Sequence, residues 1–321
     1  MNFHRPKYRR WRRIKRRLLI SFSGGETSAF MTLLILTQMQ NFYDEIIVVF
    51  ANTGQENEAT LEFVRDCDEH FGFRTVWIEG VQFHGQNRSA GFKIVDFETA
   101  SRDGAPFEDA IKKYGIPNQK FKDCTRNLKR MPIENYAKSI GWAPGSYDLA
   151  IGIRADEIDR MSVVAHKRRI IYPLIKRQPM TKVNINTFWR SQPFRLRLRG
   201  YQGNCKWCWK KTDRKHLTII SECPEAYDFP RRMEALYSHH GPEFRKDPAL
   251  QRDPIGPDYR RTFFRGNRSA DDLFALYDQK KGDFVPAWDD AAVYDIELDT
   301  AGGCGESCEV YGDDEDEGDE E

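Results

Sequence analysis

A glycine pair between an apolar run and a helical pattern is the feature that most constrains what this chain can fold into. Residues 18–22 are apolar enough for a buried parallel strand, and apolar residues at helical spacing predict a helix over residues 28–39. The residues around the pair are Ser23, Gly24, Gly25, Glu26, Thr27 and Ser28. Glycine lets the backbone approach phosphate oxygens, and a helix start offers free amides with a partial positive charge. The pattern therefore predicts an exposed phosphate-binding loop, with a plain strand-to-helix turn as the alternative.

The rest of the chain continues this alternation of strands and helices. Apolar runs predict strands over residues 45–50, 75–78, 147–152 and 168–174, and helical periodicity predicts helices over 58–71, 128–140 and 181–190. This order predicts an α/β fold, a doubly wound parallel sheet with helices on both faces. An irregular stretch over residues 79–122, with one short helix at 107–114, is typical of a lid or binding loop. A smaller, mainly helical and irregular C-terminal region follows, with helices over 227–237 and 270–279.

Charge divides the ends of the 321-residue chain from its middle. The net charge is +1, yet residues 5–17 hold nine Lys or Arg and no acid, whereas residues 313–321 hold eight acids. The basic arm, with Tyr8 and Trp11 between its arginines, is either a solvated leader or a contact for a nucleic-acid backbone. The acidic tail is a solvated segment or a mimic of nucleic acid. We expect four divisions: the arm 1–17, an α/β domain 18–235, a helical and irregular region 236–299, and an acidic tail 300–321.

The apolar segments are all short. None approaches the roughly 20 residues that a membrane span needs, and the apolar run behind the basic arm leads into glycines rather than a cleavage site. The sequence therefore predicts a cytoplasmic protein with no membrane partner.

Polar residues and glycines follow two other predicted strands. Asn52, Thr53 and Gly54 come after the second strand, and Gly152 and Arg154 come after the fourth. Ligands of a doubly wound sheet bind at the carboxyl ends of its strands, so we expect these residues to meet the glycine loop. The Arg154 guanidinium would bind phosphate as a fork of donors, or it would pair with a neighbouring acid.

The acids next to Arg154 and a lysine upstream complete this expected site. Asp156 and Glu157 would hold a metal such as magnesium, or they would form an exposed acidic turn. Lys129 would supply a second positive charge for phosphate. Ser23, Thr27 and Ser28 add hydroxyl donors to the loop, and no Gly-Lys-Ser/Thr follows it, so the loop is not of the Walker type.

Seven cysteines suggest a metal, a cluster or redox chemistry, because a chain without a secretion signal rarely builds a disulfide framework. Cys124, Cys205 and Cys208 would be catalytic thiols, or three ligands of an iron–sulfur cluster of the [4Fe-4S] type with one open iron. Cys223 would add a fourth ligand, which closes the cluster or builds a structural zinc site. Ordinary reduced thiols are the alternative. Cys304 and Cys308 form a looser second pair, and Cys67 is expected in the core.

The loop and several later motifs resemble a known family. Residues 23–28 are similar to the pyrophosphate loop, Ser-Gly-Gly-x-Asp-Ser, of the PP-loop ATP pyrophosphatase (adenine nucleotide alpha hydrolase-like) superfamily, with Thr27 where Asp is usual. Four further motifs resemble those of the phosphoadenosine phosphosulfate (PAPS) reductase-like family, over about two-thirds of the chain. They are residues 50–54 with Thr60 and 63–64, Cys124-Thr125 with Lys129, Gly152-Ile-Arg154 with Glu157 and Arg160, and residues 172–174.

The resemblance implies an adenine nucleotide, ATP or PAPS, bound by these motif residues. It implies first an enzyme that cleaves ATP to AMP and pyrophosphate to activate an acceptor for sulfur transfer. The three cysteines resemble those of cluster-dependent tRNA thiolation enzymes, which implies a nucleic-acid acceptor at residues 5–17 and a sulfur-donor protein. The second interpretation is PAPS reduction by Cys304 or Cys308, although the reductases' Glu-Cys-Gly-Leu/Ile-His motif is missing. The third is a nucleotide- or nucleic-acid-binding module without catalysis.

Overall fold

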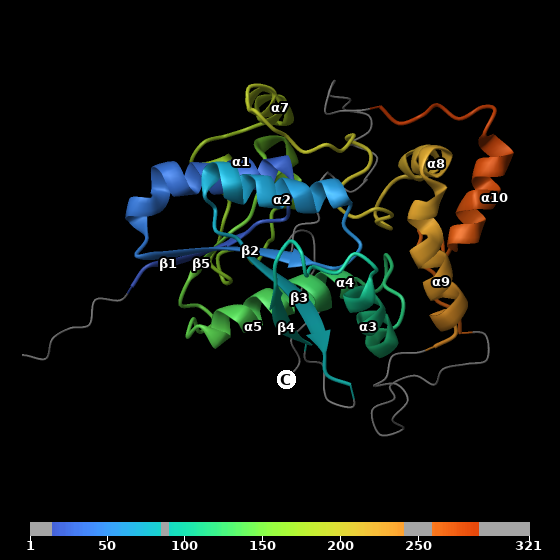
Figure 1. The fold of residues 1–321 in the computed structure, drawn as a ribbon, viewed down its shortest axis with the longest axis horizontal. Coiled ribbons are helices and arrows are strands. Elements are labelled where there is room, and N and C mark those ends of the chain that lie inside the picture. Colours follow the sequence, from blue (N-terminus) through green and yellow to red (C-terminus); the bar gives the residue numbers. More distant parts are fainter. Residues whose placement is uncertain (1–14, 85–89, 241–258, 289–321) are drawn as a thin grey trace, which may run out of the picture.

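A six-stranded sheet forms the centre of the chain, in the order β4-β3-β2-β1-β5-β6 (Figure 1). The computed structural model describes residues 15–84, 90–240 and 259–288. The strands are β1 (Arg17–Ser21), β2 (Glu45–Asn52), β3 (Val76–Gln82), β4 (Ala90–Val95), β5 (Asp148–Ala150) and β6 (Ile170–Ile171). All neighbouring pairs are parallel except β3 and β4, which are antiparallel. The predicted α/β class with its mostly parallel, doubly wound sheet is confirmed.

Two predictions about this sheet were wrong in detail. The stretch 79–122 is not irregular throughout, because β3 extends to Gln82 and β4 pairs with it over six residues. The predicted strand over 168–174 shortens to the two residues of β6, since Pro173 begins the short helix α6 (Pro173–Lys176). Proline lacks the backbone N–H that would donate a hydrogen bond to a neighbouring strand, and it is well tolerated in the first turn of a helix.

Helices cover both faces of the sheet. On one face lie α1 (Glu26–Leu34), extended by a π-helical turn over Ile35–Met39, and α2 (Glu58–Phe71), with α7 (Lys182–Arg190) beyond α1 (Figure 1). The other face carries α3 (Ala105–Tyr114), α4 (Asp123–Thr125) and α5 (Met131–Ser139), with a π-helical turn over Arg126–Arg130 between the last two. Short 3-10 turns span Gln40–Phe42, Ala155–Arg160 and Pro224–Tyr227.

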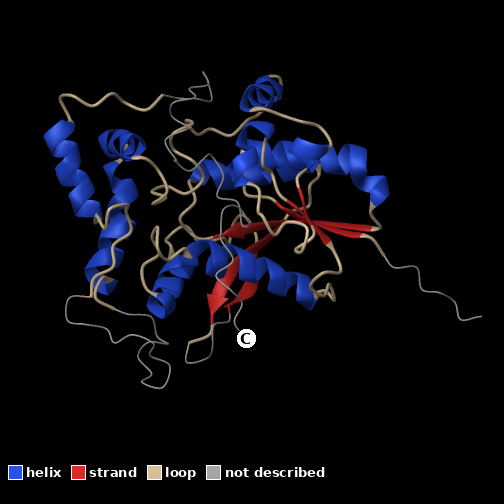
Figure 2. Cartoon of the chain, turned by 180° about the vertical axis from the view of Figure 1, so that it is seen from behind, coloured by secondary structure: helices blue, strands red, loops and turns tan. Residues whose placement is uncertain are grey.

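A group of three helices lies beside the sheet and its covering helices (Figure 2). It contains α8 (Asp213–Glu222), α9 (Asp228–Tyr237) and α10 (Ala270–Lys280), and we call it the helical unit. The sequence predicts α9 and α10 but not α8. Along the chain, α8 begins shortly after Cys205 and Cys208, and Trp207 between them is buried in the same apolar cluster as residues of α8 and α9.

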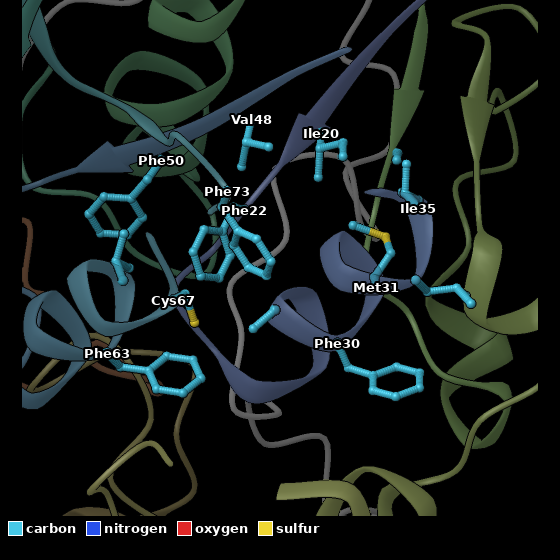
Figure 3. Packing of buried hydrophobic residues seen from close by; sticks show 14 of the residues in the cluster. Ile20, Phe22, Phe30, Met31, Ile35, Val48, Phe50, Phe63, Cys67 and Phe73 are labelled. Atoms are coloured by element: carbon cyan, nitrogen blue, oxygen red, sulfur yellow. The ribbon is translucent and has the colours of Figure 1, made fainter. Parts of the chain in front are cut away.

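Apolar side chains form separate clusters on the two sheet faces and in the helical unit. Between the sheet and the α1–α2 layer, Phe22 and Phe73 meet edge to face at a centroid distance of 5.7 Å (Figure 3). Cys67 is fully buried in this cluster, as the sequence predicts. The cluster of the helical unit is rich in aromatic rings and includes Trp207 and Phe263. Among the described residues, no helix is long and apolar enough to cross a membrane.

Candidate nucleotide-binding site

The phosphate loop turns directly from β1 into α1. Gly24 has a φ of +81°, a conformation that glycine adopts without strain, and a Cβ atom there would lie 2.7 Å from the Thr60 methyl group. Gly25 is the N-cap of α1, and no described side chain caps this helix start. The Ser23 and Ser28 hydroxyls lie 2.9 Å apart, and Ser28 Oγ also donates to the Gly25 carbonyl at 3.0 Å. The loop is therefore held in one shape by its own hydroxyls.

The loop after β5 touches the phosphate loop backbone to backbone. A Cβ atom at Gly152 would lie 2.9 Å from Ser28 Cα, and Cβ atoms in real proteins essentially never come this close to another heavy atom. Both residues follow parallel strands that are hydrogen-bonded neighbours in the sheet. The structure brings these two motifs together at the carboxyl edge, and a glycine at position 152 makes the contact possible.

Arg154 pairs with its neighbouring acids, as one of its two predicted roles requires, and it also contacts the phosphate loop. Its guanidinium Nη1 donates to Thr27 Oγ1 at 3.3 Å, so it faces the phosphate loop. Its Nε donates to Asp156 Oδ1 at 3.0 Å, and its Nη2 lies 3.4 Å from Glu157 Oε1. Arg160 pairs with Glu157, which links it to Arg154. Arg154 is 3% exposed, so this network fixes a cation beside the helix start.

The loop after β2 is held by carboxylates that the sequence did not single out. Asn52 Nδ2 donates to Glu79 Oε1 at 2.6 Å, and the Gly54 amide donates to Asn52 Oδ1 at 3.1 Å. The Thr53 amide donates to Glu56 Oε2 at 2.9 Å. These bonds turn the loop back on itself at the sheet edge.

Lys129 comes from the opposite side of this edge. Its Nζ lies 3.8 Å from Glu56 Oε1, and both side chains are almost completely buried. The structure thus places the second predicted cation beside the loop after β2 rather than beside Arg154.

The phosphate loop is buried in this conformation, whereas the sequence predicts an exposed turn. Asn204 Nδ2 donates to the Ser23 carbonyl at 2.8 Å, and Trp189 Nε1 donates to the Glu26 carbonyl at 3.0 Å. Arg195 pairs with the Glu26 carboxylate at 3.0 Å. Trp189 belongs to α7, and Arg195 and Asn204 belong to the segment between α7 and Cys205. Local sequence patterns carry no signal for such a cover, because its residues are more than 150 positions away.

Cys205 lies at the same sheet edge as the loops. It forms an isolated β-bridge with Glu56, and the Lys211 ammonium donates to the Cys205 carbonyl at 2.6 Å. Burial raises the pKa of the Cys205 thiol to about 12, with the Glu56 carboxylate adding to the rise and the Lys211 charge opposing it. Cys205 is therefore a protonated thiol at neutral pH.

The other cysteines are spread around an aromatic centre. Cys124 packs against the aromatic cluster of the helical unit. Burial raises the pKa of the Tyr227 hydroxyl well above its usual range, and the nearby Cys205, Cys208 and Cys223 raise it further. Cys223 Sγ donates to Glu225 Oε1 at 2.9 Å, and burial followed by this carboxylate raises the pKa of its thiol.

These cysteines do not fit a metal or a cluster as they stand. Over residues 15–84, 90–240 and 259–288, no three His, Cys, Asp or Glu side chains are grouped as a metal site requires. The predicted ligand set of Cys124, Cys205, Cys208 and Cys223 is therefore not assembled, and we derive no chemical step through iron–sulfur, zinc or magnesium. Cys304 and Cys308 lie outside the described residues.

A cavity of about 280 Å³ opens next to this edge, between the loop after β2 and the start of α9. Gln55, Lys206 and Phe229 line it, together with Arg102 and Arg232. The phosphate-loop residues do not line it. Gln55 follows the loop after β2, and its backbone carbonyl accepts from the amide of Lys206, which also lines the cavity, at 3.1 Å.

Comparison with known proteins places the first half of this site in a family. Residues 17–102 match the phosphoadenosine phosphosulfate reductase domain, whose family binds PAPS and adenine nucleotides. The match contains the phosphate loop and the loop after β2. It ends before the residues around Arg154 and before the cysteines of the site.

The relatives that align with the chain fall into a full-length one and two partial ones. The uncharacterized nin region protein ORF290 of Escherichia phage lambda is 29% identical over 299 residues, which are 92% of this chain and 95% of that protein. The uncharacterized proteins MJ0066 and MJ0973 of Methanocaldococcus jannaschii are 28% and 25% identical over 126 and 118 residues. These two alignments cover 39% and 37% of this chain, and 21% and 22% of those proteins.

Proposed function

The chain belongs to the PAPS reductase-like family of the PP-loop superfamily, and we propose on that basis that it cleaves ATP to AMP and pyrophosphate to activate an acceptor for sulfur transfer. The observation that carries the proposal is the junction of the two motif loops. Gly152 packs on Ser28, and Arg154 donates to Thr27 beside an uncapped helix start. Amides, hydroxyls and a fixed guanidinium then converge where a chain of phosphates would develop negative charge.

The proposed reaction has two stages, activation of the acceptor and transfer of sulfur to it. An acceptor oxygen attacks the α-phosphorus of ATP, the bond from that phosphorus to the α–β bridging oxygen breaks, and pyrophosphate leaves with the oxygen. The loop amides and Arg154 stabilise the charge on the departing pyrophosphate. A persulfide of a donor protein passes its outer sulfur to the thiolate of Cys205, the thiol next to the loops, and the donor regains its own thiol. The outer sulfur of the Cys205 persulfide then attacks the activated carbon of the acceptor, the bond from that carbon to oxygen breaks, and AMP leaves with the oxygen. A second thiol, with Cys124 and Cys208 as the candidates, attacks the Cys205 sulfur, so that the thiolated acceptor leaves and a cysteine disulfide forms, which an external dithiol reduces before the next turnover.

The test compares two glycines with equal chemistry and unequal surroundings. We expect the wild-type protein with α-labelled ATP and magnesium to release AMP and pyrophosphate. Gly152→Ala should lower this rate by more than about tenfold, because its Cβ presses on the Ser28 backbone. Gly282→Ala is the matched control, since nothing lies within 4 Å of its Cβ.

Two outcomes would contradict the proposal. ATP binding without any release of AMP would favour the non-catalytic nucleotide-binding module. An unchanged rate in Gly152→Ala, with the protein folded, would place the chemistry away from the phosphate loop.

PAPS reduction is a second candidate, favoured by the family match over residues 17–102. A thiolate of Cys304 or Cys308 would attack the sulfuryl sulfur and release adenosine 3′,5′-bisphosphate. The other thiol would then attack the S-sulfocysteine, so that a disulfide forms and sulfite leaves. Sulfite release from PAPS that a Cys304→Ser, Cys308→Ser variant loses would support this candidate over the first.

A further inference from the structure

A second arginine is bonded to the first turn of α1. Arg195 Nε donates to Glu26 Oε1 at 3.0 Å, and its Nη2 donates to Glu26 Oε2 at 3.1 Å. Glu26 is the first residue of α1 and lies between Gly25 and Thr27 of the phosphate loop. The Arg195 guanidinium is therefore anchored at the helix start whose amides would bind phosphate.

Glu26 places a negative charge where the candidate site has to accept one. Its side chain is almost completely buried, and a carboxylate in the first turn of a helix is attracted by the partial positive charge of the helix start. Phosphates are attracted by the same partial charge and are repelled by the carboxylate, because like charges repel strongly where water is excluded. Glu26 and a chain of phosphates therefore compete for the same positive partners.

Two arginines reach this turn, and Arg195 is the one that is held less tightly. Arg154 is almost completely buried, and it is bonded to Thr27 and to two acids that follow it in the sequence. The Arg195 side chain is 30% exposed, and its hydrogen bonds within the described residues all go to Glu26. These two bonds leave further N–H groups of the guanidinium for a second anion. Arg195 can thus meet a phosphate before it leaves the carboxylate.

The backbone around Arg195 is held independently of this ion pair. Phe194, Leu196 and Leu198 pack against the apolar cluster between the sheet and the α1–α2 layer. Arg195 and Arg197 alternate with them, as side chains do on the two sides of an extended chain. The apolar side chains keep the segment in place, so Arg195 can change its partner by rotation of its side chain.

We infer that Arg195 binds the β- and γ-phosphates of ATP and that it releases Glu26 when they arrive. A guanidinium binds carboxylates and phosphates with the same planar set of donors, so one ion pair replaces another. The Glu26 carboxylate is then hydrated, because the guanidinium no longer covers it. The choice of ATP rests on the proposed function, in which pyrophosphate leaves at this loop, whereas the exchange of partners rests on the ion pair itself.

The experiment is titration calorimetry of the full-length protein with magnesium and two nucleotides. α,β-Methylene-ATP has carbon in place of the α–β bridging oxygen, so its binding is measured without cleavage, and AMP lacks the β- and γ-phosphates. We expect Arg195→Gln to weaken binding of α,β-methylene-ATP by at least about tenfold and binding of AMP by less than about twofold. Glu26→Gln removes the competing carboxylate and should strengthen binding of α,β-methylene-ATP by about threefold or more.

The matched control is the next ion pair along the same segment. Arg197 Nη2 lies 2.7 Å from Glu62 Oε2 of α2, and the Arg197 side chain is exposed. Arg197→Gln and Glu62→Gln should bind both nucleotides as the wild type does. Arg195→Lys keeps the charge without the planar donors, so its affinity for α,β-methylene-ATP should lie between those of Arg195→Gln and the wild type. This variant tests the inference even if Arg195→Gln does not fold.

Several results would overturn the inference. One is an equal loss of affinity for α,β-methylene-ATP and AMP in Arg195→Gln. Another is weaker binding of α,β-methylene-ATP by folded Glu26→Gln, because the ion pair would then only hold the cover in place. An equal loss in Arg197→Gln, or tighter binding of PAPS than of α,β-methylene-ATP by the wild type, would also contradict it.

The same measurements separate this inference from the proposed function. If the expected differences in binding appear but the wild type releases no AMP from ATP, the proposed function alone is rejected. If AMP is released and Arg195→Gln binds α,β-methylene-ATP as the wild type does, the inference alone is rejected.

Discussion

The sheet edge and the helical unit hold their functional side chains by different forces. At the sheet edge, Arg154 is fixed by hydrogen bonds and ion pairs to Thr27, Asp156 and Glu157. Beside the helical unit, Cys124 packs against an aromatic cluster in which the Trp207 and Phe263 ring centroids are 4.7 Å apart. Hydrogen bonds and ion pairs fix the orientation of a side chain, whereas close packing of apolar groups fixes mainly how far it is buried.

This difference has a chemical consequence for each region. The guanidinium at the sheet edge is charged and aimed before any ligand arrives, which is what electrostatic stabilisation of phosphate requires. The thiol of Cys205 is held protonated by its surroundings, with a pKa of about 12. The guanidinium is therefore already in place, whereas the cover of Trp189, Arg195 and Asn204 has to move from the phosphate loop before a phosphate can bind. The Cys205 thiol has to lose its proton before it can act as a nucleophile.

The largest expected effect separates the two regions by stability. Trp207→Ala removes a side chain that is 1% exposed, and we expect it to lower the free energy of unfolding by about 3 to 5 kcal/mol. Hydrogen exchange should show the loss of protection in α8–α10 before it appears in β1 and β2. Trp288→Ala, at a side chain that is 59% exposed, should change stability by less than about 0.5 kcal/mol. Equal loss of protection in both regions would mean that they unfold as one unit.

The next effect tests the polar side of the comparison. Arg154→Gln should weaken ATP binding by about 100-fold, equivalent to about 2.7 kcal/mol, in titration calorimetry. Arg154→Lys keeps the positive charge but loses the planar set of donors that binds phosphate through two hydrogen bonds, so we expect an ATP affinity between those of Arg154→Gln and the wild type. Arg231→Gln removes an arginine of α9 that pairs with Asp271 on the surface and should bind ATP normally. Unchanged affinity in Arg154→Gln would remove this residue from the site.

The smallest effect concerns a carboxyl group inside the helical unit. Burial raises the pKa of Glu234 from 4.5 to about 7, although the group accepts from the Phe263 amide at 3.0 Å and from the Ala270 amide at 2.8 Å. Between these pH values the folded chain holds a proton that the unfolded chain has lost. Its contribution to stability is therefore present below about pH 4.5 and falls as the pH rises through 7, by on the order of 1 to 3 kcal/mol.

The measurement for Glu234 is urea unfolding at pH 5 and pH 8. Glu234→Gln should flatten the decrease in stability between these two pH values relative to the wild type. Glu69→Gln, on the exposed side of α2, serves as the control and should keep the wild-type dependence. If the Glu234 variant and the wild type lose the same free energy of unfolding between pH 5 and pH 8, the buried carboxyl group does not cause this pH dependence.

The sequence predicts those parts of the fold that depend on neighbouring residues. The order from β1 to β3 follows from uninterrupted apolar runs and helical periodicity, and the glycine pair between β1 and α1 marks the phosphate loop. The edge strand β4 was missed because only Ala90 of its six residues is buried, which weakens the apolar signal. The helix α8 was missed although Thr212 accepts from the Lys215 amide as an N-cap, a signal that could have found it.

The candidate site was predictable where strand ends converge and unpredictable where distant residues cover them. Gly152 and Arg154 meet the phosphate loop because neighbouring parallel strands end at the same edge. Glu56 had no distinguishing local pattern, and its role appears only when Thr53 and Lys129 contact it. Arg195 and Asn204 depend on long-range folding, which spacing in one sequence does not encode.

The bond from Asn204 to the Ser23 carbonyl spans 181 positions of the chain. During translation, the glycine turn therefore leaves the ribosome early. Asn204, which covers this turn, is added only after all six strands of the sheet. A fragment that stops at Arg102, where the family match ends, contains the turn but lacks both Arg154 and Asn204. During synthesis, the contact of Asn204 with the phosphate loop therefore forms only after all six strands have emerged, and it can form before α8, α9 and α10 are made.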